Sequence, residues 1–187
     1  MSDVIGRLQD KLAITSKNRK PIIHFDSVPL FKGLKHLNSL YNYIANKQTI
    51  KIVYQPFSAK EPNEYIYYPY LLKEFRNRWF VFGSRAEDLV LFNFSLDRII
   101  SIEPVDVPYR ENPNFDSEHF FADIVGVSKN IGDKPRKVRF WANREQSMYI
   151  ITKPIHSSQK INHENHIEGS HIFEINVVIK YELFSVF

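Results

Sequence analysis

The amino-acid sequence predicts a mainly β protein of the α+β class, in which a small β-barrel follows a helix and precedes a small α+β domain. Short period-two stretches recur at roughly ten-residue spacing between residues 50 and 102, which is typical of a small barrel. Fifteen Phe and ten Tyr against six Gly favour strands over loops, because flat rings suit a pleated surface. The 187 residues, 43% of them hydrophobic, are enough for one ordinary domain plus a smaller one.

The chain is predicted to begin with a polar, basic linker over residues 1–33. Within it, residues 8–14 are interpreted as the tail of a helix and residues 22–25 as a short extended piece. An amphipathic helix is predicted over 34–47, because apolar residues recur there on one helical face. These apolar residues are Leu34, Leu37, Tyr41 and Ile44.

The barrel is assigned to residues 34–108 and is predicted to contain five strands. Apolar and polar side chains alternate in the first strand, and turn-forming residues separate the others. Pro69 lies inside the second strand and predicts a sheet edge or a bulge, because proline donates no backbone hydrogen bond. The predicted strands cover residues 50–55, 64–72, 78–82, 89–96 and 98–102.

A second domain is predicted over residues 109–187, after a linker that is rich in proline. Asn143 and Gln146 have the spacing of a capping box and predict a helix from there to about residue 152. The apolar ending YELFSVF starts a further helix, so this domain is expected to be truncated. The remaining predicted elements are a helix at 117–123 and strands at 137–142, 159–165 and 172–181, the order found in half of an α+β sandwich.

Composition and motifs exclude several classes of protein. The chain has no Cys, which excludes disulfides, zinc ribbons and thiol catalysis and is compatible with a reducing cytoplasm. It has no run of about 18 apolar residues and no apolar region in its first residues, so neither a membrane span nor a secretory signal is expected. The net charge of +4 favours anionic partners such as nucleic acid.

No enzymatic activity and no cofactor are expected. The sequence contains no G-x-S-x-G, no glycine-rich phosphate loop and no D-x-D. His163, His166 and His171 lie close together, but the H-E-N-H spacing differs from that of a zinc-binding helix, so no metal site is predicted. A hydrolase would require a deep pocket that gathers histidines and carboxylates.

The stretch RNRWFVFGSRAEDLVLFNFSLDRIISIEP resembles the WYL family, which is named for a Trp-Tyr-Leu triplet. The triplet is here Trp79–Phe80–Val81, and residues 94–99 match the family's F-x-L-D-R-I element. Residues 52–54 look like its I-x-Y strand, and residues 68–72 like its P-x-x-L strand. Two positions depart from the pattern: Phe80 replaces the central Tyr, and Phe92 occupies a place where the family often has Arg.

The second domain also resembles a known neighbour of WYL domains, their C-terminal extension. This resemblance rests on residues 137–141, 154–156, Gln159 and residues 172–174, and the whole match covers about residues 22–184. The resemblance implies an Sm-like or SH3-like barrel that senses a ligand, such as single-stranded nucleic acid or a nucleotide, in a bacterial transcription regulator. It also implies a winged helix-turn-helix that binds operator DNA. Residues 1–33 carry no such pattern, so operator contacts are expected only from a module outside this chain.

The first candidate for ligand binding is Arg98, because a guanidinium presents five donors in a fork that suits phosphate. The alternative is a structural salt bridge to Asp97 or Glu103. Further candidates are basic or aromatic residues near the 75–77 turn, since charge holds a backbone and a ring stacks on bases. These candidates are Lys73, Arg76, Arg78 and Trp79.

Tyr54 and Asn93 are candidate hydrogen-bond donors to a ligand. For Trp79, the alternative to stacking on a ligand is a position in the core. Alternation places Asn93 on a mixed face with Ser95, for which a solvent-facing role is favoured. If the ligands of other WYL proteins contact the positions of Phe80 and Phe92, this chain has lost part of that ligand site or binds another ligand. These departures motivate a second hypothesis, a module that forms homodimers and has no ligand of its own.

Overall fold

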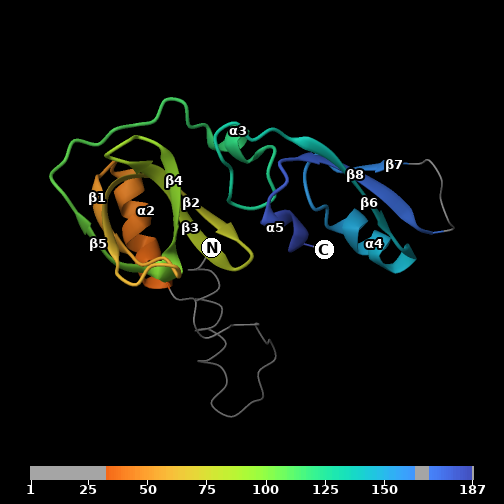
Figure 1. Cartoon of the computed structure of the whole chain (residues 1–187), viewed down its shortest axis with the longest axis horizontal. Coiled ribbons are helices and arrows are strands. Elements are labelled where there is room, and N and C mark those ends of the chain that lie inside the picture. The colour runs from red at the N-terminus through yellow and green to blue at the C-terminus, as the bar shows by residue number, and fades with distance from the viewer. Residues whose placement is uncertain (1–32, 163–168, 187) are drawn as a thin grey trace, which may run out of the picture. The chain divides into compact units, whose positions relative to one another are not determined.

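The computed structural model describes residues 33–162 and 169–186 (Figure 1). The predicted pieces at 8–14 and 22–25 lie outside the described residues, as do His163 and His166. Within the described part, two antiparallel sheets form, each with helices, so the mainly β, α+β class is confirmed. No described helix is long and apolar enough to cross a membrane.

The first helix packs against the first sheet through Leu37, Leu40 and Ile44, whereas Tyr41 of the predicted apolar face is 66% exposed. It begins as a 3-10 turn, η1 (Leu34–His36), and continues as α2 (Leu37–Ala45), two residues shorter than predicted. Leu40 is fully buried, and the His36 ring bonds to the carbonyl of Ile99 at 3.1 Å. Gly33 has φ 101°, and a side chain there would collide with the backbone of Leu96. The start of the helix is therefore fitted closely to the end of the sheet.

The first sheet has five strands in the order β4-β3-β2-β1-β5. The 3-10 turn η2 (Leu96–Arg98) connects β4 to β5. In residues 33–162 and 169–186 no ladder joins β4 to β5, so this sheet is not closed, and the small Sm-like barrel stays a prediction. The strands are β1 (Ile50–Tyr54), β2 (Asn63–Phe75), β3 (Arg78–Arg85), β4 (Leu91–Ser95) and β5 (Ile99–Pro104).

The long strand β2 is shared between two neighbours. Its first part, up to Tyr67, pairs with β1, and the part from Tyr67 to Phe75 pairs with β3. The register shifts between Pro69 and Leu71, which confirms a bulge at the proline rather than a sheet edge. Gly83 of β3 faces this place, where any side chain would collide with the carbonyl of Tyr68. The glycine therefore permits the close approach of the two strands.

The core of the first sheet is formed by α2 and one face of the strands. Tyr67 is completely buried, and its hydroxyl lies 2.7 Å from the carbonyl of Phe92 and 3.2 Å from that of Val81. Burial raises its pKa well above the usual value, so the hydroxyl remains a donor. The buried members of this core are Leu40, Ile50, Ile52, Tyr54, Tyr67, Val81, Phe94, Leu96 and Ile99.

The second sheet has three antiparallel strands in the order β6-β8-β7. The predicted helix cap is confirmed: the Asn143 side chain accepts from the Gln146 amide at 2.8 Å, and α4 ends at Thr152 as predicted. The predicted last strand ends earlier, at Val177. The elements are α3 (Ser117–Phe121), β6 (Arg136–Ala142), α4 (Arg144–Thr152), β7 (Lys160–Asn162), β8 (His171–Val177) and α5 (Tyr181–Phe184).

Two further apolar clusters join the strands of the first sheet to later residues. Phe75 packs with Val125, Ile175 and Leu183. Phe80 and Phe82 of β3 form a cluster with Val127, against which Phe115, Phe120 and Phe121 pack. The proposed boundary at 108/109 stays a prediction, and the described residues belong to one compact unit.

Candidate ligand site

Arg98 lies at the end of η2, beside two aromatic rings. Its guanidinium carbon is 4.9 Å from the centre of the Phe57 ring and 5.4 Å from that of Tyr54. Its Nε atom is buried and has no hydrogen-bond partner in the described part of the chain. Both distances are within the range of cation–π attraction. The side chain is therefore held by the flat faces of aromatic rings.

Neither predicted carboxylate forms an ion pair with Arg98 within residues 33–162 and 169–186. Asp97 accepts a hydrogen bond from the Ser95 hydroxyl and lies 3.5 Å from Nε of Arg78. Glu103 instead pairs with Lys51 at 2.5 Å. The positive charge of Arg98 is thus not neutralised by a carboxylate among these residues, which leaves the guanidinium available for an anion.

Phe57 is a component of this site that the sequence reasoning missed. It follows β1 in a loop, and 79% of its surface is exposed. The loop is fixed next to Arg98, because the Gln55 amide donates to the Arg98 carbonyl at 3.2 Å and the Gln55 side chain donates to Lys60 at 3.1 Å. The available signal was an isolated aromatic residue in a polar loop, which is a poor candidate for a core position.

Tyr54 contributes a ring to the site and anchors it in the core. Only 6% of the residue is exposed, and its ring centre is 4.7 Å from that of Phe94. Burial raises the pKa of the hydroxyl, although the nearby Arg98 charge opposes this shift. The hydroxyl therefore stays protonated near neutral pH, and the phenol acts as a rigid support for the guanidinium.

The basic residues near the 76–77 turn point to different partners. Arg78 reaches η2 through its contact with Asp97, and half of its side chain is exposed. Arg76 donates to the carbonyl of Ser185. Lys73 lies 4.2 Å from the centre of the Phe121 ring, and burial lowers its pKa. Of these three predicted site residues, the structure brings only Arg78 to the turn that carries Arg98.

Two other predicted site residues have structural contacts. Trp79 is partly buried and packs against the first core. The Asn93 amide donates to the carbonyl of Val127 at 2.9 Å and so ties β4 to the segment after α3. The prediction of a solvent-facing Ser95 is wrong: it is 1% exposed, and its hydroxyl donates to Asp97 of η2. Phe92 departs from the family pattern and is 41% exposed at the sheet edge.

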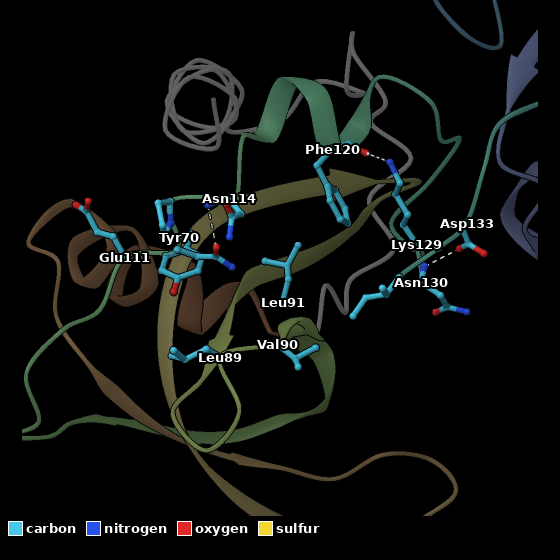
Figure 2. A pocket seen from close by; sticks show the side chains of 14 residues that line it. Tyr70, Leu89, Val90, Leu91, Glu111, Asn114, Phe120, Lys129, Asn130 and Asp133 are labelled. Atoms are coloured by element: carbon cyan, nitrogen blue, oxygen red, sulfur yellow. Dashed lines mark hydrogen bonds between the residues drawn. The ribbon is translucent and has the colours of Figure 1, made fainter.

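A cavity of about 730 Å³ lies away from these residues (Figure 2). Its charged groups already have partners: Lys129 pairs with Asp123 at 2.6 Å, and Asp133 pairs with Lys180 at 2.6 Å. Figure 2 also shows Lys129 donating to the Phe120 carbonyl and the Asn130 amide donating to Asp133. The lining residues are Tyr70, Leu89, Val90, Leu91, Glu111, Asn112, Pro113, Asn114, Phe120, Lys129, Asn130, Ile131, Gly132 and Asp133.

This cavity contains none of the predicted ligand-binding residues and no cluster of groups suited to catalysis. A smaller cavity of about 360 Å³ shares Tyr70, Glu111 and Asn112 with it. Among the described residues, no group of three or more His, Asp or Glu side chains is placed to hold a metal ion. His119 and Asp116 form an exposed pair that raises the pKa of the histidine.

Comparison with known proteins identifies one domain. The family model described as "WYL domain" matches residues 35–104, which include α2 and all five strands of the first sheet. No curated protein matches the chain. Among solved structures, the chain is similar to proteasome accessory factor B/C (PafBC) of Arthrobacter aurescens, with 14% identity and a TM-score of 0.41. That alignment covers 82% of this chain but only 22% of the PafBC chain. On the family match, residues 35–104 of the chain are a WYL domain.

Proposed function

We propose that this chain is the ligand-sensing region of a bacterial transcription regulator, and that its WYL domain binds a nucleic-acid-like or nucleotide ligand. One observation carries the proposal. The Arg98 guanidinium has no carboxylate partner among the described residues and lies against Tyr54 and the exposed Phe57. The order β4-β3-β2-β1-β5 after a helix supports an Sm-like domain as part of the same proposal.

The two kinds of side chain have complementary tasks. The planar guanidinium of Arg98 donates to phosphate oxygens, and the face of Phe57 stacks on a base. Stacking of this kind contributes about 1–3 kcal/mol per base. Arg78 adds a second charge, which Asp97 holds beside η2. Binding by charge and stacking requires no fixed base sequence, which suits a single strand or a nucleotide.

The remaining parts of the proposal concern the whole regulator. It acts by binding and not by catalysis, in the cytoplasm, and as a homodimer. Operator DNA is contacted by a helix-turn-helix outside this chain. The absence of Cys and of catalytic motifs from the sequence supports the first two parts.

The test is fluorescence anisotropy with a labelled single-stranded DNA of about ten nucleotides, a length within the usual range of small binding domains. We expect binding at about 50 mM salt and a large loss of affinity at about 200 mM, because phosphate contacts release counterions. Arg98→Ala should weaken binding strongly. Arg110→Ala removes the same charge from an exposed position away from Arg98 in the sequence, and should have little effect. No binding at low salt to single strands or nucleotides would contradict the proposal.

A homodimerisation module without a ligand is the second candidate. Large exposed apolar side chains in the last part of the chain favour it, since such patches often mark interfaces. Light scattering on the intact chain tests dimerisation, which both candidates include, and a monomer contradicts this one. The oligonucleotide titration separates them, because a dimer that binds no oligonucleotide supports the second candidate. The exposed side chains are Trp141, Met148, Tyr149, Tyr181 and Phe184.

A further inference from the structure

The second sheet has one apolar face and one charged face. Side chains alternate across a strand, so odd and even positions of β6 point to opposite faces. The apolar face packs against Val125 and Leu183, in the apolar cluster that contains Ile175, and includes Val138 and Phe140 of β6. We call the opposite face the outer face. It carries Lys137, Arg139 and Trp141 of β6, Ile172 and Glu174 of β8, and Lys160 of β7.

Glu174 lies at the centre of the outer face between cations. In the strand register it stands opposite Arg139 on one side and Lys160 on the other. Its carboxylate oxygens are 2.9 Å from Nζ of Lys137 and 2.9 Å from Nε of Arg139. Hydrogen bonds from these two cations hold the pKa of Glu174 below its usual value, so it stays ionised. Lys137 and Arg139 therefore share one carboxylate, and with Lys160 opposite it the outer face has two positive charges in excess.

The cations are accessible to a partner. The side chains of Lys137 and Arg139 are 61% and 56% exposed, whereas that of Glu174 is 20% exposed. An approaching anion therefore meets the positive groups before it meets the carboxylate. Lys160 is also exposed, and it forms no ion pair with another described residue.

Trp141 gives the outer face a stacking surface. It follows Lys137 and Arg139 at the alternate positions of β6 and is 59% exposed. Ile172, its partner on β8, lies beside it in the register. Successive side chains on one face of a strand are about 7 Å apart, comparable to the spacing of phosphates along an extended single strand. Two cations and a ring thus follow one another along β6 at a repeat that suits one strand of nucleic acid.

We propose that the outer face is a second binding surface for single-stranded nucleic acid. Trp141 stacks on a base, while Lys137, Arg139 and Lys160 hold the neighbouring phosphates. The surface lies on β6, β7 and β8 and shares no residue with the site at Arg98, so it does not depend on ligand binding there. Exposed cations favour an anionic partner, and the ring favours one with flat bases over an acidic protein or a lipid headgroup.

The chain has two Trp residues, which allows the proposal to be tested directly. Trp79→Phe leaves Trp141 as the only tryptophan, and its emission then reports on the outer face alone. At low salt, a single-stranded oligonucleotide should quench this emission, since a stacked base is in contact with the ring. In the complementary variant, Trp141→Phe, all of the tryptophan emission comes from Trp79. Circular dichroism confirms that both variants are folded.

Charge variants test the phosphate contacts. Lys160→Ala leaves the pairs of Glu174 intact and should lower the slope of log Kd against log salt by about one. Trp141→Ala should weaken binding to the outer face about tenfold or more. The matched control, Lys134→Ala with Lys153→Ala, removes two exposed cations that do not belong to the outer face, and should leave the Trp141 quenching unchanged.

The quenching is also measured in a protein that carries Arg98→Ala, which separates this surface from the proposed site in the WYL domain. Persisting quenching supports an independent second surface, whether or not Arg98 binds a ligand. Several outcomes overturn the proposal: no change in Trp141 emission at low salt, loss of quenching with Arg98→Ala, or an equal response to acidic peptide. A blue shift with anionic vesicles and no effect of oligonucleotide would instead assign the face to a membrane.

Discussion

Phe57 contributes little to the fold, because 79% of its surface remains in water. Phe57→Ala should therefore change the free energy of unfolding by no more than about 0.5 kcal/mol. The same change should weaken binding of a single-stranded oligonucleotide about tenfold, since the stacking ring beside Arg98 is lost. Urea denaturation and anisotropy measure the two effects. The control is Tyr41→Ala, which removes another exposed ring, 66% exposed, from α2 and should leave affinity unchanged.

A second prediction at this scale concerns two glycines with positive φ. Gly33 has φ 101° and abuts the backbone of Leu96, whereas Gly132 has φ 85° and open space within 4 Å of the point that a side-chain carbon would occupy. Gly132→Ala should cost about 1 kcal/mol from backbone strain alone. Gly33→Ala adds a steric collision and should cost about 3 kcal/mol. Equal losses of stability in urea would show that the close approach of Gly33 to η2 is unimportant.

At the scale of elements, α2 is joined to β5 through His36 and Ile99. Burial lowers the pKa of His36 below 6.5, although the hydrogen bond to Ile99 opposes the shift. The unfolded chain thus binds the proton more readily, and this part of the stability is present above about pH 6.5 and declines as the pH falls below it. Unfolding of wild type and His36→Gln at several pH values should show a weaker acid dependence in the variant. Burial also lowers the pKa of His156, so some dependence should persist.

The hairpin between β2 and β3 turns through Arg76 and Asn77, which have φ values of 50° and 62°. Positive φ at both central positions is the arrangement that favours Asn-Gly in two-residue turns. Asn77→Gly should therefore raise the free energy of unfolding by about 0.5 kcal/mol, as the strain of a side chain at positive φ is removed. Thermal unfolding measures this gain. A drop in stability would show that the Asn77 side chain has a stabilising role of its own.

The elements that local patterns specify were predictable from the sequence. Alternation placed the strands, the Asn143 cap placed α4, and Pro69 indicated a bulge. Long-range contacts explain most of the differences between the predicted elements and the observed ones. β3 continues to Arg85 because β2 pairs with it there, which no local pattern shows. Asn93 bonds to a carbonyl 34 residues away, and the Arg98 site needs a loop residue that carries no periodic signal.

At the scale of the whole molecule, residues of the first sheet share apolar clusters with later parts of the chain, including the second sheet. Phe75, the last residue of β2, packs with Ile175 of β8, and Phe82 packs with Phe121. Residues 33–162 and 169–186 should therefore unfold in one transition, with coincident circular dichroism and tryptophan emission curves. Phe75→Ala should lower the stability by about 2 kcal/mol and separate the two curves. Two transitions in the wild-type protein would contradict this coupling.

The bulge at Pro69 also has a mechanical consequence. Strand β2 changes partners near this residue, from β1 to β3, and proline has no amide hydrogen to donate. Residue 69 therefore donates no amide to a ladder where the partners change. Its carbonyl accepts a hydrogen bond from the Tyr109 hydroxyl at 2.8 Å. The bulge in the longest strand of the described protein thus anchors the segment that follows β5.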